Sequence, residues 1–558
     1  MHLPRLLLLL LVSPLALAQT VPDAGQLRQQ IERGLPTPNN QSMPREALPP
    51  APMAAPTGPI LIQEFQFAGN TLLSKQALAV VTQAWLNRPL QFTQLQEVAI
   101  AVADAYRAAG WVVRAYLPRQ EIVNGVVRIQ IVEARFGRVQ TEAPSTLRHR
   151  EIAPFVAIAQ RGQSQGRPLD AKALDRALLL LSDLPGVEVA GSLTEGQQQA
   201  ESDLILKIND KPWWSGDAGS DNTGSRSTGA ARLTANLAIN SPWGRLDQGQ
   251  LNLAHTQGSD YLRLAYFVPA GADGLRAGAS ASVLQYRLVG AYFDALGARG
   301  DSSTWGLELS YPALRSRYAN IYVTSAWDRK AFKNLSADAT TSDYRISTLS
   351  LGINGNRRDT GNDGGLTQAS ATLTFGDVDL RNSPNQAGDA ATTQVAGQYS
   401  KLRYSVSRQQ TLLRQWALLA ALSGQVAGKN LDSSEKFYLG GASGVRAYPS
   451  GEAGGSDGQL VNLELRWALP SNVALSGFYD WGAVTVNHHN DFAGGALRNQ
   501  LQLQGAGLAL GWTSDRGIST KITWARRLGE NPNPSATGND QDGSLLRDRF
   551  WLHASASF

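Results

Sequence analysis

The second half of the chain consists largely of short segments in which apolar and polar residues alternate. In the clearest segment, Val461, Leu463, Leu465, Trp467 and Leu469 alternate with Asn462, Glu464, Arg466 and Ala468. A period of two places one set on each face of a strand. From Trp213 onward about sixteen such strands can be recognised, and no helical period is found. So many half-apolar strands favour a lipid-facing barrel over a soluble sheet.

The connections between these strands alternate in length, which predicts their orientation. Short connections are expected at Thr411 to Gln415, Pro470 to Asn472 and Ser514 to Gly517. The intervening connections are long, and they are expected at residues 333–344, 377–397, 430–459, 485–500 and 528–548. Short periplasmic turns and long external loops are typical of outer-membrane barrels. We therefore expect a barrel at residues 211–558, and an even strand number would place both of its ends in the periplasm.

The amino-terminal segments carry the signals of export and of a tethered helix. Residues 1–18 combine a basic start, a short apolar run and Ala16-Leu17-Ala18, which predicts a signal peptide. Residues 19–35 predict a helix that Asp23 begins and Gly34 ends. Residues 36–59 contain eight prolines, a composition typical of an extended linker. No other segment approaches the roughly 20 apolar residues of a spanning helix.

Two α+β modules are expected between the linker and the barrel. Residues 60–137 predict strand, helix, helix, strand and strand, with Gly110 ending the second helix and Asn124-Gly125 forming a hairpin turn. Residues 138–210 repeat this order, with a helix from Asp170 to Leu184. Two tandem modules are our interpretation, and a single α+β domain is the alternative.

Composition excludes several other classes of protein. The chain of 558 residues has no cysteine and a net charge of +5, with 51 basic residues scattered among 46 acidic ones. A nucleic-acid-binding protein would cluster its basic residues. We expect no cofactor and no metal, because His488-His489 is better read as part of a solvated loop. No nucleophile-elbow or zinc-hydrolase motif occurs, so nothing in the sequence indicates an enzyme. The triplet Arg299-Gly300-Asp301 matches an integrin-type adhesion motif of an external loop, but a chance match in a polar loop is the better interpretation.

A glycine-rich segment from Leu439 to Pro449 carries a single arginine, Arg446. On the strand from Val473 to Val484, the alternation assigns Phe478, Asp480 and Gly482 to the lumen. A confined arginine requires an anionic partner, because an unpaired buried charge is costly. We therefore predict that the loop folds into the barrel and that Arg446 pairs with Asp480. In the alternative, Arg446 is solvated and Asp480 lines a wet pore.

These residues resemble a known family. Val445-Arg446-Ala447-Tyr448 resembles the Val-Arg-Gly-Tyr motif of the outer-membrane superfamily that contains barrel-assembly and two-partner secretion transporters, and Phe478-x-Asp480-x-Gly482 resembles the strand motif that receives the arginine. Ala447 departs from the usual glycine and is expected to restrict the loop backbone. Further similarities are spread over the mature chain: Phe65 to Asn70, Leu117 to Gln120, Asp221 to Gly229, and Leu309 to Pro312 with Arg315. With its proline-linked helix and two modules, the chain is most similar to two-partner secretion transporters of the haemolysin-activator type.

The resemblance implies a fold and a function. The fold would be two periplasmic POTRA modules, a 16-stranded antiparallel transmembrane barrel, and an amino-terminal helix that plugs the lumen at rest. The protein would export a partner exoprotein, a haemolysin, adhesin or contact-dependent toxin, across the bacterial outer membrane. The modules would bind this partner, by adding its strands to their sheet edges. A barrel-assembly factor and a passive porin are the alternatives.

The chain ends in an amphipathic strand with an aromatic last residue. Phe550, Leu552, Ala554, Ala556 and Phe558 share one face. Such an ending resembles the signal that barrel proteins present to their assembly machinery in the outer membrane, which is therefore an expected partner together with the lipid bilayer.

Overall fold

The computed structural model describes residues 21–34, 59–143, 152–161, 163–198, 201–290, 293–359, 364–535 and 537–558. The predicted signal peptide and nearly all of the predicted linker lie outside these residues, and both remain predictions. In the part of the chain that is described, no helix has both the length and the apolar character needed to cross a membrane.

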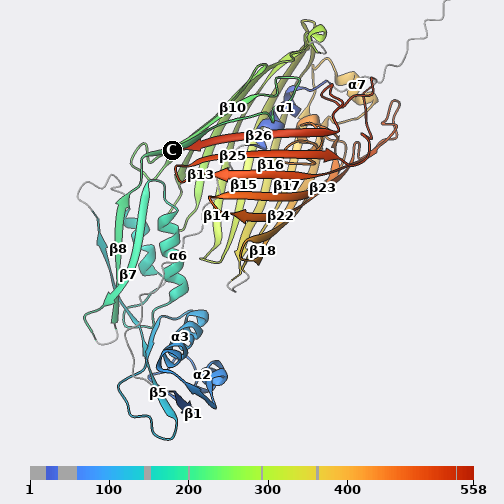
Figure 1. The fold of residues 1–558 in the computed structure, drawn as a ribbon. Helices are drawn as coiled ribbons and strands as arrows, with labels where there is room; N and C mark the ends of the chain where they lie inside the picture. The colour runs from blue at the N-terminus through green and yellow to red at the C-terminus, as the bar shows by residue number, and fades with distance from the viewer. Residues whose placement is uncertain are drawn as a thin grey trace, which may run out of the picture.

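Sixteen antiparallel strands form a closed barrel, as predicted (Figure 1). Its last strand pairs with its first, from His553 opposite Asp221 to Ser557 opposite Asp217. The strands are β9 (Trp214–Asp221), β10 (Arg232–Asn240), β11 (Gln248–Thr256), β12 (Ser259–Pro269), β13 (Arg276–Arg287), β14 (Arg299–Arg315), β15 (Ala319–Ser336), β16 (Ala339–Arg358), β17 (Gly365–Asp379), β18 (Gly397–Leu413), β19 (Trp416–Ala427), β22 (Asp457–Leu469), β23 (Val473–Thr485), β24 (Gln500–Thr513), β25 (Ile518–Arg527) and β26 (Asp548–Ser557).

The barrel wall is apolar outside and polar inside. On β14, the side chains of Trp305, Leu307 and Leu309 are 50%, 54% and 48% exposed. Ser302 and Thr304, which alternate with them, are buried. A soluble sheet would show the opposite pattern, whereas lipid is the solvent that covers such an outer face.

Three details of the barrel differ from the sequence prediction. The predicted loop at residues 333–344 is instead the tip of the β15–β16 hairpin, in which β16 alone has 20 residues. Phe332 and Tyr344 are buried on the inner face of this hairpin. The two strands therefore continue through residues that the sequence analysis assigned to a loop. A short helix, α7 (Gln386–Ala391), lies in a connection where no helix was expected. The triplet Arg299-Gly300-Asp301 belongs to strand β14 and is not in a loop.

The segment before the barrel forms two small α+β modules, each with its own apolar core. In the first, helices α2 (Lys75–Thr82) and α3 (Phe92–Ala109) pack against β2 (Glu64–Ala68), β5 (Val126–Glu133) and β4 (Val113–Tyr116), beside a small sheet of β1 (Ile60–Ile62) and β3 (Arg88–Leu90). The second has sheet order β6 (Arg135–Glu142), β8 (Glu201–Asp210), β7 (Val187–Glu195) and helices α4 (Ala153–Val156), α5 (Ile158–Arg161) and α6 (Ala171–Ser182).

Strand β6 corrects the expected border between the modules. It begins at Arg135 and pairs with β8, so the border expected between residues 137 and 138 falls inside it. Arg135 and Phe136 belong to the second module because they pair with Glu201 and Ser202 of β8. This pairing joins residues that are distant in the sequence.

The second module contacts the barrel end at which the chain terminates (Figure 1). Arg315, at the end of β14, forms an ion pair of 2.7 Å with Asp183. Arg176 on α6 donates to the carbonyl oxygen of Pro312 at 3.0 Å. These contacts fix the module at the short-turn end of the barrel.

The amino-terminal helix α1 (Ala24–Glu32) lies inside the barrel. Asp23 caps it by accepting a hydrogen bond from the Gln26 backbone at 2.8 Å. Its apolar face, Ala24, Leu27 and Ile31, belongs to one buried cluster with lumen residues such as Tyr261, Phe332 and Ile346. The helix is therefore packed against the inner wall of the barrel.

Candidate functional site

The connection between β19 and β22, residues 428–456, folds back into the barrel; we call it the inserted loop. It contains η3 (Ser433–Glu435), β20 (Phe437–Tyr438) and β21 (Gly454–Gly455). Backbone hydrogen bonds stabilise its glycine-rich part. The Val445 N–H donates to the Leu439 carbonyl oxygen at 2.8 Å, and the Gly440 N–H donates to the Glu452 carbonyl oxygen at 3.0 Å. Glycine is needed at 441, where φ is +111°. The loop is thus a packed element in the lumen.

Arg446 pairs with Asp480, which confirms the predicted contact. Its Nε and Nη2 atoms donate to the two Asp480 oxygens at 2.9 and 2.8 Å, and its backbone N–H donates to Asp480 at 3.1 Å. Arg446 is 7% exposed and Asp480 is fully buried. The Phe478 ring centre lies 3.4 Å from the guanidinium carbon. This bidentate geometry fixes the orientation of the arginine as well as its charge.

Two lumen residues of β22 complete this ion-pair group. Glu464 accepts from the Nη1 atom of Arg446 at 2.9 Å and from Arg466 at 2.7 Å. Asn462 donates to Asp480 at 2.7 Å. Two arginines therefore pair with two carboxylates, and the Lys521 ammonium acts on the same charges. Both partners were visible in the sequence as the polar face of a strand, but sequence reasoning assigned them no role.

The other three residues of the motif pack against the barrel wall, where a glycine makes room for Ala447. Val445, Ala447 and Tyr448 are fully buried in one apolar cluster with Phe478. A Cβ at Gly505 would lie 2.6 Å from the Cβ of Ala447, so the alanine is accommodated by a glycine on the wall. Ala447 is not among the residues with positive φ. The expected restriction of the backbone at Ala447 is therefore wrong, because this position has no need of glycine.

Other contacts attach the inserted loop to distant parts of the barrel. Glu435 binds Lys330 and Lys401, each at 2.6 Å. Burial raises the pKa of the Glu435 carboxyl, but the two lysines hold it well below its ordinary value. Trp551 on the last strand donates to the carbonyl oxygen of Arg446 at 2.8 Å. The Trp551 contact has no local signal in the sequence, since it joins residues 105 positions apart.

The inserted loop also holds α1. Ser433 donates to the two Asp23 oxygens at 2.9 and 2.7 Å. Gln29 and Arg33 donate to loop carbonyl oxygens, those of Lys436 at 2.8 Å and Tyr438 at 3.1 Å. Burial, with Asp23 nearby, raises the pKa of Asp432 to about 6. A cavity of about 830 Å³ lies beside the loop and the helix.

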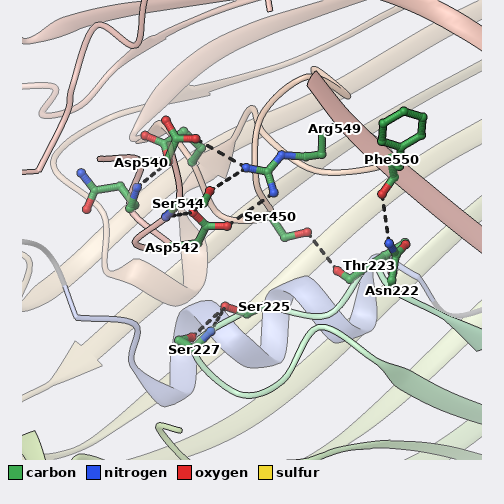
Figure 2. A network of polar contacts seen from close by, with 12 residues as sticks. Asn222, Thr223, Ser225, Ser227, Ser450, Asp540, Asp542, Ser544, Arg549 and Phe550 are labelled. Carbon is green, nitrogen blue, oxygen red and sulfur yellow. Dashed lines mark hydrogen bonds and ion pairs between the residues drawn. The ribbon is translucent and has the colours of Figure 1, made fainter. Parts of the chain in front are cut away.

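Residues from both ends of the barrel sequence meet around the outer edge of the inserted loop. Figure 2 shows Ser450 reaching the first hairpin, where it donates to the carbonyl oxygen of Thr223 at 3.0 Å. In the same view, Asn222 donates to the carbonyl oxygen of Phe550 at 2.9 Å, which extends the pairing of the first and last strands. Arg549 points toward Asp540, Asp542 and Ser544 of the last external loop.

The two terminal phenylalanines lie on the outer face of the last strand. Phe550 and Phe558 are each 58% exposed, and the ring of Phe558 lies 5.3 Å from that of Trp214. Their expected role in assembly remains a prediction. In the described residues, no group of three or more histidine, cysteine or acidic side chains is placed to hold a metal ion. His488 lies 2.8 Å from Asp457.

Comparison with known proteins identifies the family. The model of the family "Haemolysin secretion/activation protein ShlB/FhaC/HecB" matches residues 200–513, more than half of the chain. The chain belongs to this family. A model of the ShlB-type POTRA domain matches residues 60–134. The protein is accordingly a two-partner secretion transporter of the outer membrane, with POTRA domains in the periplasm, and it acts with a secreted exoprotein.

Individual relatives support this assignment along the whole chain. The heme/hemopexin transporter protein HuxB of Haemophilus influenzae is 25% identical over 561 residues, covering 98% of this chain and 96% of HuxB. The outer membrane transporter CdiB of Dickeya dadantii is 24% identical and covers 77% of each chain. The structure of CdiB from Escherichia coli has the same fold, with a TM-score of 0.62 at 20% identity over 96% of each chain. These matches favour secretion over barrel assembly or a passive porin.

Proposed function

We propose that this transporter takes an unfolded exoprotein from its periplasmic modules and passes it through the barrel once α1 has left the lumen. The observation that carries this proposal is the arrangement inside the barrel. The inserted loop is anchored to the wall by buried ion pairs, whereas α1 is held there by hydrogen bonds and by one apolar face. Among the described residues, the one ion pair of α1, between Arg28 and Glu32, lies within the helix, so its release breaks no ion pair with the wall.

The modules offer sheet edges to an extended partner segment. In the described part of the chain, β4 and β7 each pair with one neighbouring strand in their sheets. Tyr116 on β4 and Leu193 on β7 are 38% and 40% exposed. An added strand would gain backbone hydrogen bonds at such an edge, and its side chains would contact these apolar residues. Binding of this kind requires an unfolded partner.

The names of the relatives, which include a heme/hemopexin transporter and a hemolysin transporter, support an exported protein as the partner. Haemolysins, adhesins and contact-dependent toxins are the candidates. A photo-crosslinking residue at Leu193 of the full-length protein tests the binding step in cells. We expect a crosslink to the exported partner, and none from Glu530, an exposed residue of the last external loop. Equal crosslinking at both positions would count against binding by the modules.

We further propose that the outer-membrane assembly machinery recognises the last strand through Phe550 and Phe558. Their exposed rings and the lipid-facing position of the strand support this role. Replacing both by serine should reduce the amount of assembled barrel, measured by heat-dependent mobility in gels. Replacement of Leu497, which is 88% exposed in an external loop, is the matched control.

A further inference from the structure

Three consecutive residues of the inserted loop contact three different parts of the molecule. Ser450 donates to the first hairpin at Thr223. Gly451 accepts from Gln26 of α1 at 3.4 Å. Glu452 accepts from the loop between β25 and β26, residues 528–547. This short segment is therefore where the plug helix and the last external loop meet.

Gly451 lies directly against α1. Its φ is +84°, and a Cβ at this position would collide with the side-chain amides of Gln26 and Gln30. Glycine thus meets two needs, since it adopts a left-handed conformation and lets the loop backbone approach the helix. A shift of the neighbouring residue would change this contact.

Glu452 holds the adjoining backbone from the outer side. Its side chain is fully buried. One carboxylate oxygen accepts from the Asn531 amide at 3.0 Å, and the other accepts from the Gln541 backbone at 2.9 Å. We call Glu452, Asn531 and Gln541 the outer clasp.

The surroundings of the clasp show that Glu452 is not needed for charge balance there. Arg527 and Arg549 face Asp540 and Asp542 in a buried ion-pair group. Asn531 links that group to the clasp, because it also donates to Asp540 at 2.8 Å. The two arginines already balance the two aspartates, so Glu452 adds a third buried carboxylate. Its removal leaves a neutral group, and the last external loop keeps its own ion pairs.

We propose that Glu452 is a positioning residue for the plug: the last external loop, through the outer clasp, keeps Gly451 against α1 and so retains the helix in the lumen. The inference rests on the proposed role of α1 in closing the lumen. It assigns the external loop a role distinct from that of Arg446, which attaches the loop to the wall. Loss of the clasp loosens the plug, whereas loss of the Arg446 pair disturbs the lumen itself.

Conductance of the full-length protein in planar bilayers tests this role, compared with a variant that lacks residues 19–34. We expect Glu452→Ala to open several-fold more often than the unmodified protein, toward the level of the helix-deleted variant. Glu530→Ala, which changes an exposed carboxylate of the same external loop, is the control and should behave as the unmodified protein. Asn531→Ala removes a clasp donor with Glu452 in place and should also increase opening.

A second readout separates positioning of α1 from general weakening of the barrel. The chain has no cysteine, so a single cysteine at Gln30 reports the accessibility of α1. Glu452→Ala should speed its modification by a bulky maleimide several-fold, while heat-dependent gel mobility still shows an assembled barrel. Unchanged opening and labelling, with the helix-deleted variant more conductive, would overturn the proposal alone. No increase on helix deletion would refute the plug and, with it, this inference.

Discussion

Leu439 of the inserted loop occupies the space that a side chain at Gly482 of β23 would fill. A Cβ at Gly482 would lie 2.6 Å from Leu439 Cδ2. Two residues earlier on the same strand, Asp480 binds Arg446. The Phe478-x-Asp480-x-Gly482 pattern therefore combines a charge that binds the loop with a gap that admits it.

Gly482→Val should displace the inserted loop, because the branched side chain would overlap with Leu439 in a packed interior. We expect partner secretion to fall at least several-fold while the barrel still assembles. Gly477→Val on the same strand is the control, since a Cβ there would meet only Leu508, at 3.8 Å. Equal secretion by the two variants in a culture-supernatant assay would contradict the role of the gap.

Arg446→Ala should reduce secretion strongly and leave the barrel assembled. The substitution leaves Asp480 buried without its main cation, and breaking such a pair typically costs about 3–5 kcal/mol. Arg446→Lys should restore secretion only in part, because an ammonium cannot bind both carboxylate oxygens as the guanidinium fork does. Arg414→Ala, at an exposed position in a short turn, is the control. Full secretion by Arg446→Ala would refute a functional role for the arginine.

The outer clasp should weaken as the external pH rises. Burial raises the pKa of Glu452 to about 7, above the ordinary glutamate value of about 4.3. Because its pKa is higher in the closed state, protonation of Glu452 stabilises closure. This stabilisation is complete at a pH below the ordinary glutamate pKa, and it is lost as the pH rises through about 7. The groups facing Glu452 are Asp540, Asp542, Arg527, Arg549 and Tyr448.

Opening measured in bilayers should consequently increase between pH 5 and pH 8. Glu452→Gln should lose the part of this increase that centres near pH 7. Asp432, with a pKa raised to about 6, contributes in the same direction and remains in that variant. An identical pH dependence of both proteins would show that Glu452 does not control closure.

Asp183 and Arg315 should be needed to fix the second module on the barrel. Arg315 is 6% exposed and also donates to Asn320 at 2.9 Å. Asp183→Ala leaves this arginine without its carboxylate partner, which should loosen the module and expose the segment between module and barrel to protease. The double exchange Asp183→Arg with Arg315→Asp should restore resistance in part. Unchanged cleavage of the single variant would show that the pair does not hold the module.

Local sequence patterns predicted the strands and helices of the fold. They could not predict the contacts between residues that are distant in the sequence. The period of two gave the barrel strands, and strand parity brought Arg446 to Asp480. The tip of the β15–β16 hairpin was missed because its inward face packs on α1, which no local pattern reveals. Trp551 and Glu452 were missed for a related reason, since barrel closure brings the last strand and the last external loop to the inserted loop. Ala447 is explained only by Gly505 on the facing wall.

The proposed transport route requires that α1 leave the lumen during export. Asp23→Cys with Ser433→Cys would create the only cysteine pair in the chain, at a site where the two side chains already touch. Secretion of the partner by this variant should stop under oxidising conditions and return after reduction. Equal secretion under both conditions, with the disulfide shown to be formed, would contradict the account.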